Sequence, residues 1–316
     1  MITATTAGGI TRTVCETEDD WLEERTLSVG ASETPSLIGI GFAGTNAATV
    51  WESKVRPQYR SNEEVELLML GHVMEPAIRE ACRRLRKMHV IDPMGHEIWR
   101  NAEYPRMHAS PDGFVVERGE QGPLELKNVS LWNGDEWADG EAAPLRVQAQ
   151  VQHQLACTGM RFGYAAGLIG GSQLRVVRIE RDEAFICAIR DCVAHFWEYV
   201  ERGDSPPIDG LKATAQVLQR LHPDDNGETV ELSEDLTAVV DRLIAVKESI
   251  GAAKKEVDAL QNQLIVALGD NTYGQLADGR AVSWKTQDRA GYTVEATKFR
   301  VLRTHAGHPE RKRKSR

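Results

Sequence analysis

Two short stretches decide the fold of this chain: Ser110-Pro111-Asp112-Gly113 and, shortly after it, Leu124-Glu125-Leu126-Lys127. Side chains alternate between the two faces of a β-strand, so Glu125 and Lys127 share one face while the two leucines share the other. Pro and Gly flank Asp112 and predict a turn that can bring its carboxylate beside Glu125. The sequence therefore predicts two carboxylates and one ammonium group side by side above a buried β-layer.

Two carboxylates held this close repel each other, and a cation between them would relieve the repulsion. Oxygen ligands of this kind suit Mg²⁺, or Mn²⁺ as a substitute, with water in the remaining positions. We therefore expect Asp112 and Glu125 to bind Mg²⁺, and Lys127 to orient or deprotonate a water or to stabilise a phosphorane oxygen. The alternative is an ordinary surface ion pair between Glu125 and Lys127, and the Pro-Asp-Gly turn at this spacing argues against it.

Helical and strand-like segments alternate around these two stretches, which predicts an α/β fold with a mixed β-sheet flanked by helices. The expected helices cover residues 63–89, 145–158 and a segment that ends near Gly203, and the expected strands cover 97–104, 113–117, 123–129, 162–169 and 173–179. Residues 1–205 are expected to form one domain, residues 206–230 a linker, and residues 231–316 a mainly helical C-terminal extension.

The extension carries a heptad pattern, in which apolar residues recur at alternating spacings of three and four. It predicts one long helix, or two helices broken at Gly251 that pack on each other or on the core. Further on, Asp278-Gly279 predicts a small hairpin with a type I′ turn. The basic run at 309–316 is expected to be a solvated terminus or a weak phosphate contact. The heptad positions are Leu236, Val239, Leu243, Val246, Ile250, Ala253, Val257, Leu260, Leu264 and Ala267.

Composition limits the class of protein. Hydrophobic residues make up 41% and charged residues 27% of 316 residues, which excludes a collagen-like or largely disordered chain. No run approaches 18 apolar residues and the N-terminus has no apolar signal segment, so we expect neither a membrane span nor secretion. Five scattered cysteines fit a reduced cytoplasm. The net charge of −9 argues against a coat-like nucleic-acid binder, although it permits one basic cleft.

The acid–lysine pattern resembles the PD-(D/E)XK nucleases, which have a restriction-endonuclease-like core. Within them it is similar to the YqaJ and lambda exonuclease type of phage recombination nuclease. The likeness extends to several other motifs in the family's order, over about residues 20–180. They are Trp21 with Arg25, Gly30-Ala31-Ser32-Glu33, Gly71-His72-Val73-Met74-Glu75, Gln150-Val151-Gln152 and Thr158-Gly159.

The resemblance implies roles for further residues of the metal site. Glu75 would complete the metal site, with Gly71 one helical turn earlier leaving room beside its carboxylate. The backbone carbonyl of Leu126 would be another metal ligand. Gln150 would point at the metal and its attacking water, as part of the catalytic set. Without the resemblance, Glu75 could be a solvent-facing helix residue and the glutamines a polar helix border.

Arg25 and Ser32 suit a terminal phosphate. A guanidinium group offers paired N–H donors, and Ser32 stands at an expected helix N-cap before Pro35. In lambda-exonuclease-like enzymes the matching pair holds the 5′-phosphate of the degraded strand, and the resemblance implies the same here. The alternative is that Arg25 pairs with the neighbouring acidic run at residues 16–24.

The resemblance implies a metal-dependent 5′ to 3′ exonuclease that acts on duplex DNA ends in a phage-type recombination system. It would leave 3′ single-stranded overhangs for an annealing protein of the RecT or beta type. The lambda-type relatives form a ring of three, so a homo-oligomer is expected, in the bacterial host cytoplasm. The alternatives are an endonuclease or single-strand exonuclease of the same fold, and a non-catalytic DNA-binding adaptor.

Overall fold

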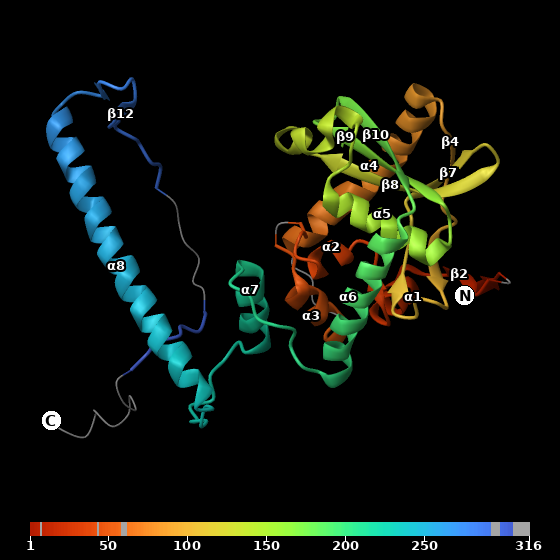
Figure 1. Cartoon of the computed structure of the whole chain (residues 1–316), viewed down its shortest axis with the longest axis horizontal. Coiled ribbons are helices and arrows are strands. Elements are labelled where there is room, and N and C mark those ends of the chain that lie inside the picture. Colours follow the sequence, from red (N-terminus) through yellow and green to blue (C-terminus); the bar gives the residue numbers. More distant parts are fainter. Residues whose placement is uncertain (7, 43, 58–61, 292–297, 306–316) are drawn as a thin grey trace. The chain divides into compact units, whose positions relative to one another are not determined.

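The structure is a computed structural model that describes residues 1–6, 8–42, 44–57, 62–291 and 298–305. The chain divides into two compact units, residues 1–220 and residues 221–316 (Figure 1). The basic run at 309–316 lies outside the described residues.

A five-stranded sheet forms the centre of the first unit, in the order β10-β9-β8-β7-β4. The β8–β9 pair is parallel and the other pairs are antiparallel, so the predicted mixed sheet is confirmed. The parallel pair is connected through the helix α5, Leu145–Thr158, which is the crossover that parallel strands require. The strands are β4 His89–Ile91, β7 Gly113–Glu117, β8 Glu120–Val129, β9 Phe162–Ile169 and β10 Gln173–Glu180.

Helices pack on both faces of this sheet because β8 buries side chains on both faces. On one face Leu124 and Leu126 pack with Ile78 and Cys82 of the helix α4, Asn62–Arg86. On the other face α5 packs on β8 and β9 with buried Val151 and Leu155. The alternation predicted for residues 124–127 therefore places the leucines under α4 and the charged pair toward α5.

Two tight turns fix the strand order. Between β7 and β8, Arg118 and Gly119 have φ of 53° and 85°, the positive values that a two-residue type I′ hairpin needs. Between β9 and β10, Gly170 and Gly171 also have positive φ, and the predicted hairpin there is confirmed. The register of β8, and with it the facing of Glu125, follows from the first turn.

The N-terminal segment adds elements that the sequence reading did not anticipate. A three-stranded sheet in the order β1-β2-β5 joins the start of the chain to a strand about 85 residues later, and a short parallel pair joins β3 to β6. The unanticipated elements are β1 Ile2–Thr5, β2 Ile10–Cys15, α1 Glu18–Thr26, β3 Val29–Gly30, α3 Ala47–Val55 and β6 Met107–His108. Their partner β5, His96–Asn101, is the strand predicted at 97–104, and α2, Thr34–Leu37, is the helix expected around Pro35.

The segment expected to be a linker at 206–230 contains the helix α7, Lys212–Leu221. Its Thr214 accepts a hydrogen bond from Asn46 Nδ2 (2.6 Å), and Arg220 pairs with buried Glu52. These contacts hold α7 to α3 and extend the first unit to residue 220. The helix before it, α6 Glu183–Arg202, ends at Gly203 in the left-handed conformation, as expected.

The second unit contains one helix of 34 residues, α8 Asp235–Leu268, which continues through Gly251 without a break. The hairpin of β11 Tyr273–Gln275 and β12 Ala281–Ser283 follows it. Its turn is not of type I′, because only Gly279 has positive φ. The backbone N–H of Leu276 donates to the carbonyl of Arg280 (2.8 Å) and closes the loop, and Asp278 accepts a hydrogen bond from the backbone N–H of Arg280 (3.0 Å) within it. In the described part of the chain, no helix is long and apolar enough to span a membrane.

Candidate active site

Glu125 is the most buried charged group of the site, with 2% of its surface exposed. Lys127 Nζ donates to Glu125 Oε1 (2.6 Å), and Gln154 Nε2 donates to Glu125 Oε2 (2.6 Å). The two partners come from β8 itself and from α5, the helix that covers this face of the sheet. Glu125 and Lys127 thus form an ion pair, but it is enclosed by α5 and is not a surface pair.

Asp112 lies directly before β7 and faces β8. Its Oδ2 accepts a hydrogen bond from the backbone N–H of Leu126 (2.7 Å). The β7–β8 ladder ends at the pair Gly113 and Leu124, so the N–H of Leu126 lies beyond the ladder and needs this side-chain acceptor. Arg79 of α4 donates to the backbone carbonyl of Asp112 (2.6 Å) and fixes the turn from the other side. The predicted meeting of the Pro-Asp-Gly turn with the strand is therefore present.

Glu75 lies on α4, 4.0 Å from Arg79. Burial raises the pKa of the Glu75 carboxyl group, and Glu125 raises it further, while His72 and Arg79 act in the opposite direction. The carboxylates of Glu75 and Glu125 therefore lie within electrostatic reach of each other. A side chain at Gly71 would meet no atom within 4 Å, so there is open space one turn before Glu75.

The electrostatics of the site are dominated by an excess of negative charge. Burial raises the pKa of Asp112 well above its usual value, and repulsion from Glu125 and Glu75 adds to this effect. Burial acts against the ammonium form of Lys127, but attraction to Glu125 and Asp112 outweighs it and raises the pKa. The ammonium group of Lys127 and the guanidinium group of Arg79 thus face three carboxylates, and an additional cation would relieve the remaining repulsion.

The donor set fits a hard divalent cation that keeps much of its hydration. Among the described residues, no group of three His, Cys, Asp or Glu side chains is arranged to hold an ion. Mg²⁺ commonly takes one or two carboxylates plus water, which is what Asp112 and Glu125 can offer. Buried Gln150 Oε1 also has no hydrogen-bond partner within the described residues, so an acceptor remains available near this helix face. The Leu126 carbonyl stays a predicted ligand.

The two glutamines of α5 differ in what they contact. Gln150 is 5% exposed and lies one turn before Gln154 on the same helix, but the bond to Glu125 comes from Gln154. The sequence reading singled out Gln150 and missed Gln154 as a contact of the site. The i, i+4 spacing of the two residues was the available signal, because it places both on one helix face.

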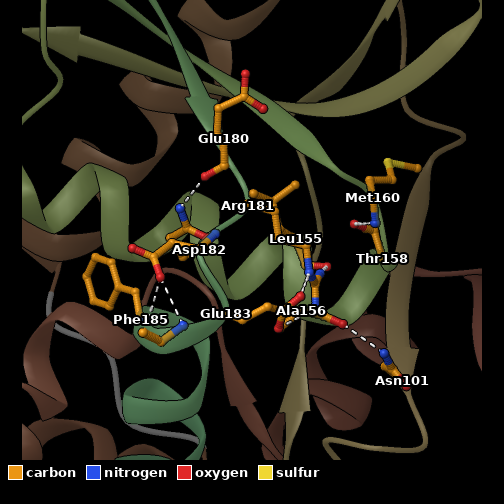
Figure 2. A network of polar contacts seen from close by, with 12 residues as sticks. Asn101, Leu155, Ala156, Thr158, Met160, Glu180, Arg181, Asp182, Glu183 and Phe185 are labelled. Atoms are coloured by element: carbon orange, nitrogen blue, oxygen red, sulfur yellow. Dashed lines mark hydrogen bonds and ion pairs between the residues drawn. The ribbon is translucent and has the colours of Figure 1, made fainter.

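The end of α5 is held by a network of polar contacts (Figure 2). Asn101 Nδ2 donates to the carbonyl of Ala156 (3.0 Å), and Arg181 donates to the carbonyl of Leu155 while it pairs with Glu183. Gln152, which belongs to the predicted Gln-Val-Gln motif, bonds the backbone of residues 180 and 182 (2.7 and 3.0 Å). This network fixes the helix from which Gln154 reaches Glu125.

Arg25 is connected to the turn at residues 110–113 through its neighbour Trp21. The Arg25 guanidinium is 4.2 Å from the centre of the Trp21 ring, and Trp21 Nε1 donates to Ser110 Oγ (3.2 Å). Ser110 begins the Pro-Asp-Gly turn that positions Asp112. Arg25 is thus connected by two consecutive contacts to Ser110, two residues before Asp112.

Ser32 is exposed, but it is not a helix N-cap, and that expectation is corrected. Glu33 is the residue before the four-residue helix α2, and its carboxylate accepts from the backbone N–H of Gly30 (2.7 Å) and from Lys54 (2.8 Å). Lys54 Nζ also donates to the carbonyl of Arg25 (2.9 Å). Lys54 therefore links the backbone of Arg25 to the residue that follows Ser32.

His108 lies two residues before the turn at residues 110–113, but it is too buried to contact a phosphate. It is 1% exposed and its Nδ1 is hydrogen-bonded to Ser28 Oγ (2.8 Å). Burial lowers its pKa well below the usual value, so the ring is neutral and inaccessible at physiological pH.

All five cysteines are unpaired.

Comparison with known proteins gives matches in sequence and in structure. Residues 20–161 match the YqaJ-like viral recombinase domain. The uncharacterized protein YqaJ of Bacillus subtilis is 28% identical over 277 residues, which cover 84% of this chain and 83% of that protein.

Two solved structures are similar at low identity. An alkaline exonuclease from Laribacter hongkongensis is 23% identical with a TM-score of 0.48, covering 58% of this chain and 93% of that one. A phage-related exonuclease from Haemophilus somnus is 12% identical with a TM-score of 0.41, covering 57% of this chain and 96% of that one.

Proposed function

Residues 20–161 match the YqaJ-like viral recombinase domain, and from this match we propose that the protein is a metal-dependent exonuclease that degrades duplex DNA from its ends. The observation that carries the proposal is the meeting of Asp112, in the turn before β7, with Glu125 and Lys127 of the adjacent strand β8, and of Gln154 with Glu125. A purely structural or adaptor role offers no reason to gather three mutually repelling carboxylates around one lysine.

Asp112 and Glu125 would hold Mg²⁺, or Mn²⁺ in its place, and Glu75 would join through water. When bound, such an ion lowers the pKa of a coordinated water and offsets charge on the phosphoryl oxygens. Gln154 keeps the Glu125 carboxylate oriented toward the site, and the bond from Leu126 does the same for Asp112. Lys127 keeps its proton, because its pKa is raised, and so can stabilise negative charge on the phosphorane.

The proposed polarity of digestion, from the 5′ end of a strand, rests on Arg25 and Ser32. A terminal 5′-phosphate carries more negative charge than an internal diester, and a guanidinium group favours it through charge-assisted bonds. The contact of Trp21 with Ser110 brings α1 close to the turn that carries Asp112. We place the 5′ end there, which implies digestion from 5′ to 3′ and a 3′ overhang. That overhang would be the substrate of a strand-annealing partner.

The decisive experiment is digestion of end-labelled linear duplex DNA, with and without a 5′-phosphate, in Mg²⁺ and in EDTA. We expect release of nucleotides from phosphorylated ends in Mg²⁺, none in EDTA, and none from Asp112→Ala in either buffer. Covalently closed circular duplex serves as the control substrate and should stay intact. Cleavage of the circle would identify an endonuclease, and digestion of single strands alone would identify a single-strand exonuclease.

A further inference from the structure

The helix α8 exposes a continuous apolar seam along its length. Leu268 is its one buried residue, and the hairpin covers that end, since a side chain at Gly274 would lie 2.9 Å from Leu268 Cδ2. Within the described residues of the second unit, the rest of the seam stays exposed. Exposed fractions along the seam run from 37% to 63% for Leu236, Val239, Val246, Ile250, Val257, Leu260 and Leu264.

The seam has the period of a coiled coil. The alternating spacings of three and four place Leu236, Leu243, Ile250, Val257 and Leu264 at a positions and Val239, Val246, Ala253, Leu260 and Ala267 at d positions. A strict seam of this width is completed by a second helix with the same period. A second copy of α8 has that period by definition. The charged residues at the e and g positions beside the seam distinguish a parallel from an antiparallel pair.

The flanking charges oppose a parallel pair. In a parallel coiled coil each g residue lies near the e residue of the next heptad on the other helix. Arg242 would then lie beside the partner's Lys247, twice by symmetry, and none of the other pairs of a g residue with the facing e residue joins opposite charges. Parallel association therefore brings two like-charge contacts and no attractive ones.

An antiparallel pair reverses this balance. When Ile250 packs opposite the partner's Val246, Arg242 lies beside the partner's Glu256, and symmetry repeats the pair. One like-charge contact remains, between Lys247 and the partner's Lys247. Two attractive contacts against one repulsive contact favour this register over the parallel one.

We infer that α8 is an assembly element that pairs antiparallel with α8 of a second copy of this chain. This assembly is separate from any ring formed by the nuclease unit, because its contacts lie wholly on α8. It would join two nuclease units through their C-terminal extensions.

The mass of the full chain, measured by sedimentation with far-UV circular dichroism as a check on helix content, tests the inference. We expect Ile250→Asp to halve the mass of the assembly and to leave basal DNA digestion unchanged. Val266→Asp is the matched control, because Val266 is an apolar residue of the same helix that lies off the seam and is 82% exposed. Equal masses for the wild type and Ile250→Asp would overturn the inference.

Exchange of charges tests the orientation. Arg242→Glu should raise the dissociation constant by about ten-fold, because both attractive pairs become repulsive. Glu256→Arg alone should do the same, and the double variant should restore the wild-type value. A parallel pair predicts tighter association for Arg242→Glu, since the introduced carboxylate would then face the partner's Lys247, and that result would overturn the antiparallel assignment.

Discussion

At the scale of single residues, the site could be predicted where chemistry and spacing coincide. Asp112, Glu125 and Lys127 stand out in the sequence because a turn and an alternating strand place them together. Gln154 did not stand out, because its spacing places it on one helix face with Gln150 but does not show which of the two reaches Glu125 until the helix is packed on β8. The burial of His108 was also invisible, since it depends on Ser28 and on elements far away in the chain.

The carboxylates should be essential for cleavage and dispensable for binding. We expect Asp112→Ala and Glu125→Ala to abolish digestion while DNA ends are still bound, because these groups hold the ion and not the duplex. Lys127→Ala should abolish digestion with near-normal metal binding. Product release and filter binding on the same duplex measure the two properties, and efficient Mg²⁺-dependent digestion by either carboxylate variant would contradict the assigned site.

Gln154→Ala should reduce the rate of digestion without unfolding the protein. The variant loses a hydrogen bond to a charged group, worth about 1.5–3 kcal/mol, so we expect a fall in kcat of roughly ten- to a hundred-fold. Gln148→Ala is the matched control on α5, because Gln148 donates to the carbonyl of Ala143 and not to Glu125. Similar rates for the two variants would argue against a role for Gln154 in the site.

Arg25 should determine which end is attacked. The wild type is expected to prefer 5′-phosphorylated over 5′-hydroxyl duplex, and Arg25→Ala should lose this preference as turnover on the phosphorylated end falls toward the hydroxyl-end rate. Arg25→Lys should recover part of it, because it keeps the charge but not the paired donors. Arg84→Ala, which removes an exposed arginine of α4, is the control. An unchanged end preference in Arg25→Ala would exclude the phosphate pocket.

At the scale of elements, the long periodic segments were predicted well and the short ones were not. The bounds of α5, β7 and β9 agree with the pattern because each is a regular run ended by Gly or by a turn. The short strands β1, β2 and β3 were missed, since they depend on pairing with β5 and β6 far away in the sequence. The helix α7 was missed because the Pro- and Gly-rich segment before it has the composition of a linker.

The contacts of α7 set where the chain can be shortened. A chain ending at residue 223 should fold and digest DNA at the basal rate. A chain ending at residue 210 should be less stable by about 3 kcal/mol, because it loses the ion pair of Arg220 with Glu52 and the burial of Val217. Urea denaturation of the two fragments provides the measurement, and equal midpoints would show that α7 does not stabilise the first unit.

At the scale of the whole molecule, the buried carboxylates of the site should lower the free energy of unfolding when no metal is present. The pKa of Asp112 is raised in the folded state above its unfolded value of about 3.9. A raised pKa means that the folded state binds the proton more tightly than the unfolded state does. The resulting stabilisation is fully present below the unfolded pKa of about 3.9 and is lost as the pH rises through the folded pKa.

We therefore expect the Tm of the metal-free protein to fall over this pH range, and to fall less in Asp112→Asn. Mg²⁺ should raise the Tm of the wild type at neutral pH and have little effect on Asp112→Asn, because a ligand stabilises only the state that binds it. Differential scanning calorimetry with and without EDTA measures both effects. A Tm of the variant that rises equally with Mg²⁺ would place the ion elsewhere.

The type I′ turn at Arg118 and Gly119 has a consequence for how this protein can diverge. Because strand side chains alternate between the two faces, the face that Glu125 occupies depends on whether the number of residues between that turn and Glu125 is odd or even. Inserting one residue at the start of β8 would bury the acid and the lysine under α4 and turn the two leucines toward α5. Two inserted residues would restore the facing. Length variation among functional descendants of this chain should therefore occur in even steps at this point, while loops elsewhere remain free to vary by any number.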